Sequence, residues 1–262
     1  MSGYFCNGLR AASMALAMAS GTMAAAAGFE ETSGAMPMVA VESYDWEGFF
    51  VGATLGGAIF NVEASDLTDT FTNDSPSISM LRPSYGLRLQ YNWIPFDNNL
   101  VIGPEGDLVF GLLNERVVEF NTAGTDGIAY TYSWDSAMSL RARAAMTNGR
   151  ILSYVAGGPA WVNAVYTVED LDPLTPGGCD VNICAEFEET LLGLSFGAGM
   201  EYAYRDNIIA TFEFMHYEMP MAQANILTAG TTPTCTGADA EECTVFFDQS
   251  ASVVRVGVSY RF

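Results

Sequence analysis

Apolar and polar residues alternate with a period of two in eight separate segments of this 262-residue chain. The pattern is clearest in 85–93, where Leu87 and Leu89 alternate with Arg88 and Gln90. Because successive side chains of a β-strand point to opposite faces, each segment predicts a strand with one apolar and one polar face. The eight predicted strands are 47–60, 85–93, 102–110, 130–143, 151–162, 192–202, 208–214 and 254–262.

The fourth and fifth predicted strands differ in how regular their alternation is. In 130–143 the apolar face is predicted to carry Tyr130, Tyr132, Trp134, Met138 and Leu140, opposite Ser133, Asp135, Arg141 and Arg143. The strand 151–162 is the least regular, because Val155 and Trp161 fall on its predicted inner, polar face.

The connections between the predicted strands alternate in length. The second, fourth and sixth are short and rich in turn-forming residues: 94–99, 147–150 and 205–207. The first, third, fifth and seventh are long, at roughly 62–80, 114–128, 167–189 and 218–249. Aromatic residues gather near strand ends, and no stretch after residue 30 has eighteen consecutive apolar residues, which argues against membrane-spanning helices.

Short turns at one end, long loops at the other and aromatic strand ends are typical of an outer-membrane barrel, with its apolar face toward lipid. We therefore predict an all-β fold, an eight-stranded antiparallel transmembrane β-barrel with short periplasmic turns and long extracellular loops. The alternative is a soluble barrel with an apolar interior, which the regular alternation of short and long connections disfavours. Residues 1–27 have the composition of a signal peptide, 28–45 are expected to be a periplasmic segment, and 46–262 to form the barrel.

Several parts of the chain resemble the small outer-membrane β-barrel (porin-family) domain common in alphaproteobacteria, akin to OmpA-type and OmpX-type barrels. The resembling segments lie within 44–57, 86–107, 139–161 and 197–207, and in the terminal VRVGVSYRF. Pro104 and Pro159 depart from the pattern, because proline removes a ladder hydrogen bond. The resemblance implies insertion by the barrel assembly machinery, which reads the outward residues of the last strand: Val256, Val258, Tyr260 and Phe262.

The formal net charge of −21 argues against a nucleic-acid partner, which requires a cationic surface. On the predicted inner face, however, positive and negative charges nearly balance. The predicted interior charge network comprises Arg88, Glu105, Asp107, Arg141, Arg143, Glu201, Glu213 and Arg255, with Arg261 as a further candidate and Asp135 higher up the interior. Enclosed charges lose hydration and must be paired, and eight strands leave an interior that side chains can fill, so the network predicts a structural plug.

The remaining acids concentrate in the predicted long loops, beside the expected lipopolysaccharide, where we expect divalent cations to form weak bridges; no calcium-binding motif occurs in the sequence. No cofactor and no dedicated metal site are expected. Cys179, Cys184, Cys235 and Cys243 are expected to form disulfides in an oxidising compartment, either locally (179–184, 235–243) or between loops.

His216 is the sole histidine, and its parity with Phe212 and Phe214 points it toward lipid or the membrane interface. Glu218 shares its face, but no serine lies near it in sequence, so we expect no enzymatic activity. The sequence thus favours a structural and surface-presenting outer-membrane protein. A narrow channel for small solutes or ions, and an adhesin or receptor acting through acidic, disulfide-braced loops, remain as alternatives.

Overall fold

The computed structural model describes residues 43–66, 77–95, 99–120, 127–171, 183–228, 232–233 and 244–262. All regular structure in these ranges is β. The strands are β1 (Gly48–Asp66), β2 (Ser77–Asn92), β3 (Leu100–Phe120), β4 (Gly127–Asn148), β5 (Ile151–Leu171), β6 (Ile183–Arg205), β7 (Ile208–Glu218), β8 (Ala222–Thr228), β9 (Thr232–Pro233) and β10 (Thr244–Arg261). Within the described ranges, no helix is long and apolar enough to cross a membrane.

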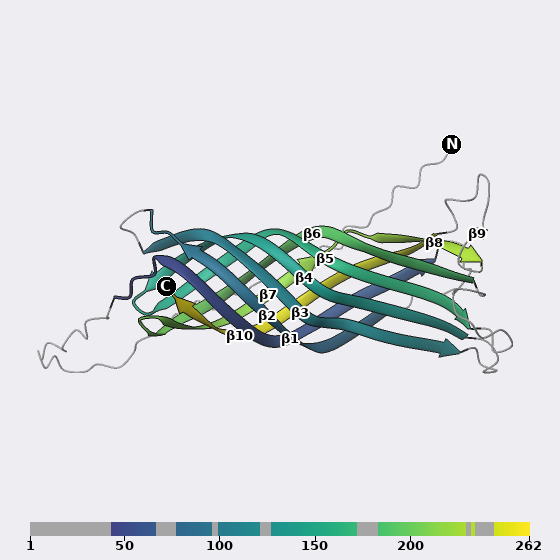
Figure 1. Cartoon of the computed structure of the whole chain (residues 1–262), viewed down its shortest axis with the longest axis horizontal. Coiled ribbons are helices and arrows are strands. Elements are labelled where there is room, and N and C mark those ends of the chain that lie inside the picture. Colours follow the sequence, from purple (N-terminus) through teal and green to yellow (C-terminus); the bar gives the residue numbers. More distant parts are fainter. Residues whose placement is uncertain are drawn as a thin grey trace, which may run out of the picture. The chain divides into compact units, whose positions relative to one another are not determined.

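The strands form a closed antiparallel ring. Each of β1 to β6 pairs with the next strand, β7 pairs with β10, and β10 returns to β1 over the register Phe50↔Arg261 to Asp66↔Val245 (Figure 1). β8 continues the course of β7, because both lie antiparallel to β10 and to β6. The ring therefore has eight strands, with β7 and β8 sharing one position, which confirms the predicted fold class.

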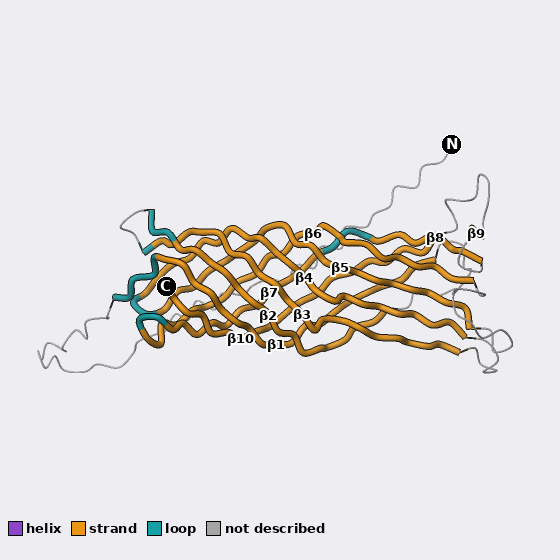
Figure 2. The backbone as a smooth tube through the Cα atoms, viewed as in Figure 1, coloured by secondary structure: helices purple, strands orange, loops and turns teal. Residues whose placement is uncertain are grey.

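The strands extend well past the predicted ends, which corrects the predicted loops. β1 reaches Asp66, β3 reaches Phe120, β5 reaches Leu171 and β8 lies entirely within the predicted loop 218–249. Several acids assigned to loops therefore lie on strands: Glu63, Glu169, Glu186, Glu188, Glu189, Glu218 and Asp248. Alternation could not reveal these extensions, because outside a membrane both faces of a strand can be polar. Figure 2 shows most described loop segments at the end of the ring that carries the C-terminus, and a further one between β7 and β8.

Large apolar side chains cover the outside of the ring. Leu55, Leu87, Leu140, Leu194 and Val256 are among those that are more than half exposed. At the short-turn end this band finishes in exposed aromatic residues: Phe49, Tyr91, Trp93, Tyr202, Tyr204, Tyr260 and Phe262. An apolar belt with an aromatic girdle is the surface expected of a barrel in lipid.

The interior is not polar throughout, which corrects the expectation of a polar lumen. Its middle is charged, but an apolar cluster around Phe50, Val101 and Leu152 fills the short-turn end. A larger cluster fills the other half, and its aromatic members are Phe60, Tyr130, Tyr132, Trp134, Tyr166, Tyr217 and Phe247. The charged residues thus form one layer between two apolar ones.

A β-bulge in β4 explains why three aromatic residues were predicted on the wrong face. The pairing of β4 with β5 shifts register between Trp134 and Ser136, so Asp135 is an extra residue. Tyr130, Tyr132 and Trp134 are therefore buried inside, although Met138 and Leu140 face outward as predicted. Asp135 itself is exposed, so it does not belong to the interior charges.

The parity of β5 was also predicted wrongly. Leu152, Tyr154 and Ala156 are buried, whereas Val155 is 60% exposed, so Val155 and Trp161 lie on the outward side. The inner residues of this strand are apolar or aromatic as well, and the polar residues that would mark an inner face are missing from it.

Both strand prolines lie where a ladder is interrupted. Pro104 pairs with Ala142 on β4, but no pair with β2 is formed at its position. Pro159 pairs with Leu194 on β6, and the β4–β5 ladder is broken beside it. The adjoining Gly103 and Gly158 allow close approach, because a Cβ there would collide with the backbone of the neighbouring strand. The prolines are thus tolerated, each with its missing N–H turned toward an interruption.

Candidate functional site: a closed ring of buried charges

The eight residues of the predicted charge network lie together in the middle of the barrel. Six strands supply them: β2, β3, β4, β6, β7 and β10. All eight are at most 3% exposed. Alternation on each strand turns these side chains inward, and ring closure brings them to the same level.

Six of the eight form a closed ring in which positive and negative charges alternate. Its order is Arg88, Glu201, Arg143, Glu105, Arg141, Glu213 and back to Arg88. The nitrogen–oxygen distances are 2.5 Å for Arg88–Glu201, 3.1 Å for Arg143–Glu201, 3.5 Å for Arg143–Glu105, 3.1 Å for Arg141–Glu213 and 3.7 Å for Arg88–Glu213. Arg141 and Glu105 are also paired. Every charge in the ring therefore has two neighbours of opposite sign.

Arg255 and Asp107 form a branch on this ring. Arg255 contacts Glu213 at 2.6 Å and Asp107 at 2.9 Å, so Glu213 bonds to three guanidinium groups. Tyr217 donates its hydroxyl hydrogen to Asp107 at 3.2 Å. Four arginines thus face four carboxylates and the cluster is formally neutral, which offsets much of the cost of taking these ions out of water.

Neutral partners complete the network, and the predicted network did not include them. Arg88 donates hydrogen bonds to the Tyr154 hydroxyl at 2.9 Å and to Thr211 Oγ1 at 3.0 Å. The guanidinium of Arg143 lies 4.1 Å from the centre of the Tyr154 ring, a cation–π contact. The parity of Tyr154 with Leu152 was the available signal, and the wrong face assigned to β5 obscured it.

The segment before β1 covers the short-turn end. Trp46 is 1% exposed, packs with Phe50 and Leu152, and donates its indole hydrogen to the carbonyl of Gly149 at 3.1 Å. The Tyr44 hydroxyl donates to the carbonyl of Asp206 at 2.8 Å. Because Gly149 and Asp206 belong to two different turns, this segment ties the turns together and closes the interior from that side.

Arg261, a further candidate for the predicted network, contacts the segment before β1 instead. Its guanidinium lies 2.5 Å from Asp45, whose side chain is 66% exposed. Burial alone raises the pKa of Asp45, but hydrogen bonds from Arg261 and from the Glu47 backbone N–H outweigh it and the pKa is lowered. The charged form of Asp45 is therefore favoured in the folded protein.

The lowered pKa gives a pH-dependent contribution to stability. Asp45→Asn should lower the free energy of unfolding at neutral pH by less than about 1 kcal/mol, the size of an exposed ion pair. Since the folded pKa lies below the unfolded one, this difference is fully present above about pH 4 and disappears as the pH falls through the folded pKa. Urea titrations of both proteins at several pH values measure it. A difference that stays constant down to strongly acidic pH contradicts this assignment.

The other predicted site residues lie elsewhere. Val256, Val258 and Tyr260 lie on the outward face of β10, and Phe262, directly after the strand, is exposed as well. Cys184 is buried near the start of β6, whereas Cys179, Cys235 and Cys243 lie outside the described residues, so the disulfides remain a prediction. Residues 1–42, with the predicted signal peptide, also lie outside them.

His216 faces outward as expected, and a serine lies beside it that sequence distance concealed. Ser252 on β10 stands directly opposite His216 on β7, and its Oγ lies 2.9 Å from the histidine Nδ1. Glu218 Oε2 lies 3.2 Å from Nε2. Cross-strand pairing between β7 and β10 is what brings these three residues together.

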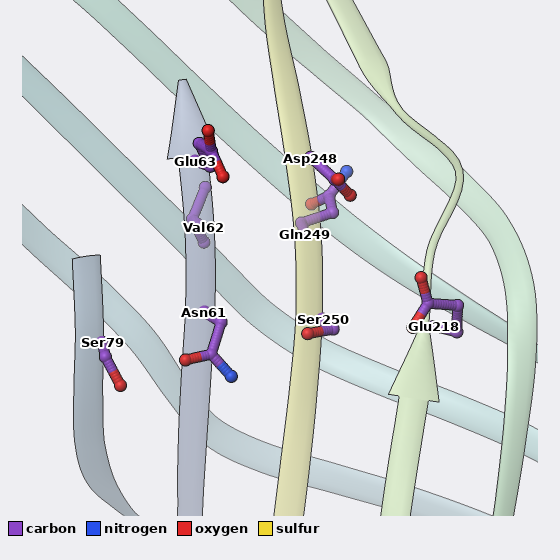
Figure 3. Close-up of a pocket in the computed structure, with 8 residues that line it drawn as sticks. All are labelled: Asn61, Val62, Glu63, Ser79, Glu218, Asp248, Gln249 and Ser250. Carbon is purple, nitrogen blue, oxygen red and sulfur yellow. The ribbon is translucent and has the colours of Figure 1, made fainter. Parts of the chain in front are cut away.

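An acidic hollow of about 260 Å³ lies on the outward side of the same strands. Figure 3 shows Glu63 on β1, Asp248 on β10 and Glu218 at the end of β7 around it. Glu63 and Asp248 are cross-strand partners. Among the described residues, no group of three or more potential ligands is arranged to hold a metal ion. The hollow marks the level at which the apolar belt gives way to polar side chains.

Comparison with known proteins identifies the family of this chain. A 31 kDa outer-membrane immunogenic protein of Brucella melitensis is 26% identical, with 96% of this chain and 98% of the relative covered; its Brucella suis counterpart matches equally. The solved structure of OprG from Pseudomonas aeruginosa aligns with a TM-score of 0.46 at 12% identity, over 85% of this chain and 100% of that one. The family model described as outer membrane protein beta-barrel domain matches residues 12–262. The chain therefore belongs to the outer-membrane β-barrel protein family and is located in the outer membrane.

Proposed function

We propose that this outer-membrane barrel has a structural role in the cell envelope, presents its long connections at the cell surface, and does not conduct solutes. The observation that carries the proposal is the closed ring of six alternating charges across the middle of the interior. A conduit needs charged groups that face water, whereas these buried arginines and carboxylates form ion pairs with one another.

The layers on either side of the ring support a plug. Trp46 and its apolar neighbours fill the short-turn end, and Phe60, Trp134, Tyr166 and Phe247 belong to the cluster that fills the opposite half. An eight-stranded barrel has an interior that side chains can fill completely. A narrow channel, the main alternative from the sequence, would have to open through all three layers.

Surface presentation has separate support. The Brucella relatives are named immunogenic outer-membrane proteins, which makes exposure at the cell surface a reasonable property of this chain. The strands on the long-connection side extend beyond the apolar belt and carry acids such as Glu63, Glu186 and Glu188. We propose lipopolysaccharide and outer-membrane lipid as its surroundings, divalent cations as weak bridges to these acids, and the barrel assembly machinery as the partner for insertion.

Planar-bilayer recording tests the plug. The refolded wild-type protein should give no steady single-channel conductance above the bilayer baseline, because no layer of the interior offers a hydrated path. A general diffusion porin recorded in the same bilayers serves as the positive control. Reproducible conductance steps from the wild type that scale with salt concentration would refute the structural plug and favour the narrow channel.

A further inference from the structure

We propose that Ser252, His216 and Glu218 form a hydrolytic triad on the outside of the barrel, acting on acyl esters of amphiphiles in the outer leaflet. This site is separate from the interior network, so its test is independent of the test of the structural plug. It lies at the level where the apolar belt ends, which is where the ester groups of membrane amphiphiles reside.

The three side chains have the mutual geometry that activates a serine. The Ser252 hydroxyl lies 2.9 Å from His216 Nδ1, and Glu218 lies 3.2 Å from Nε2. A carboxylate at Nε2 accepts the hydrogen on that nitrogen, which leaves the Nδ1 lone pair directed at the serine hydroxyl. A nucleophile, a base and a group that orients the base are the parts required for covalent acyl transfer.

The backbone fixes this geometry. Ser252 and His216 are directly opposite in the β7–β10 ladder, and Glu218 is two residues beyond His216 on the same face. Phe196, the partner of His216 on β6, supports the imidazole with ring centres 5.1 Å apart. The His216 side chain is 23% exposed, so it is held on one side and remains accessible on the other.

The strand ends immediately after Glu218. Pro220 interrupts the strand between β7 and β8, and its carbonyl accepts a hydrogen bond from the Gln249 side chain at 3.2 Å. Interruptions of this kind re-aim side chains and are common beside active sites. Here the interruption leaves Glu218 58% exposed at the rim of the acidic hollow.

The surroundings select the substrate class. Ile59 on β1 is the outward partner of Ser252, and Phe214 and Val254 follow toward the middle of the barrel, so the three form an apolar track for an acyl chain. Toward the other side lie Asn61 and the carboxylates of the acidic hollow. In Figure 3 the Asn61 amide on β1 lies beside Ser250 of β10, its cross-strand partner, so the polar side of the site begins one pair beyond Ser252 on this face. Glu63 and Asp248, the carboxylates of the hollow that do not contact His216, favour a headgroup that is uncharged or cationic.

The chemistry balances with water as the second substrate. Ser252 Oγ attacks the ester carbonyl while His216 Nδ1 takes the hydroxyl proton. The carbon–oxygen bond to the alcohol then breaks, and His216 returns the proton to that alcohol. Water, deprotonated by His216, hydrolyses the acyl-serine, so that a fatty acid leaves and Ser252 regains its proton.

Labelling of the refolded full-length protein with an alkyl fluorophosphonate tests the nucleophile. The wild type should be labelled at Ser252, as peptide mass spectrometry will locate, and Ser252→Ala and His216→Asn should lose the label. Ser153→Ala is the matched control, since Ser153 is an exposed outward strand serine paired with Met200 instead of a histidine. Labelling only at other serines, or none in the wild type, overturns the triad.

Hydrolysis of p-nitrophenyl acyl esters in detergent micelles tests turnover. Ser252→Ala and His216→Asn should lower kcat about 100-fold, the usual contribution of a positioned general base. Glu218→Gln should lower kcat with KM unchanged, because Glu218 orients the base without touching substrate. Heat-modifiable migration on gels verifies that each variant is folded. Equal hydrolysis by folded wild type and Ser252→Ala refutes the activity.

Discussion

Replacing Glu213 by glutamine is expected to lower the free energy of unfolding by about 3–5 kcal/mol, the usual cost of breaking a buried ion pair from one side. Glu213 is fully buried and contacts Arg88, Arg141 and Arg255. Glutamine keeps the shape but removes the charge, so three guanidinium groups share the remaining carboxylates and the interior gains a net positive charge.

Urea titration of the protein folded in phospholipid vesicles measures this loss. Glu63→Gln is the control, because Glu63 is an exposed acid on the outside of β1 and its replacement should change the stability by no more than about 0.5 kcal/mol. Equal effects of the two substitutions would show that the interior charges are hydrated and unpaired, which contradicts the ring.

Placing arginine at Val256 is the second change with a large expected effect, a loss of about 2–4 kcal/mol. Val256 is 56% exposed on the outward face of β10. Along the strand it lies between Tyr260, in the aromatic girdle, and Ser252, where the apolar belt ends. An arginine there must place its charge near the middle of the hydrocarbon layer, where it has no partner.

Ser250→Arg tests the same strand and face near the interface, where the expected cost is only about 0–1 kcal/mol. The two variants are compared by urea unfolding from vesicles, with far-UV circular dichroism to verify the strand content. If Val256→Arg costs no more than Ser250→Arg, the apolar belt of β10 does not lie at the depth assigned to it.

The charge network shows how far a sequence pattern can reach. Arg88, Glu105, Arg141 and Glu213 each alternate with apolar neighbours, and a barrel turns every second residue inward, so their burial followed from parity. Their order in the ring did not. Which carboxylate contacts which arginine depends on how far neighbouring strands are shifted along each other. A shift by one residue pair moves a side chain to a different height along the barrel axis.

The misplaced aromatic residues show where parity fails. Tyr130, Tyr132 and Trp134 are apolar and alternate correctly, but one extra residue at Asp135 reverses their direction relative to Arg141 and Arg143. The alternation did not reveal the bulge, because Tyr130, Tyr132 and Trp134 alternate with the smaller Thr131 and Ser133 just as residues of a lipid-facing strand would. The apolar layer between the charged layer and the long connections was not predicted, for the same reason.

The amino-acid sequence by itself determined the compartment, the eight-stranded architecture and the face on which most charges lie, because lipid on one side and an enclosed interior on the other impose a strict period of two. Only the tertiary structure decided what those faces assemble. The strand extensions, the closed charge ring, the cover formed by Trp46 and the meeting of Ser252 with His216 all depend on register between strands distant in sequence. Hydrogen-bonded pairing sets that register across the sheet, and no local run of residues encodes it.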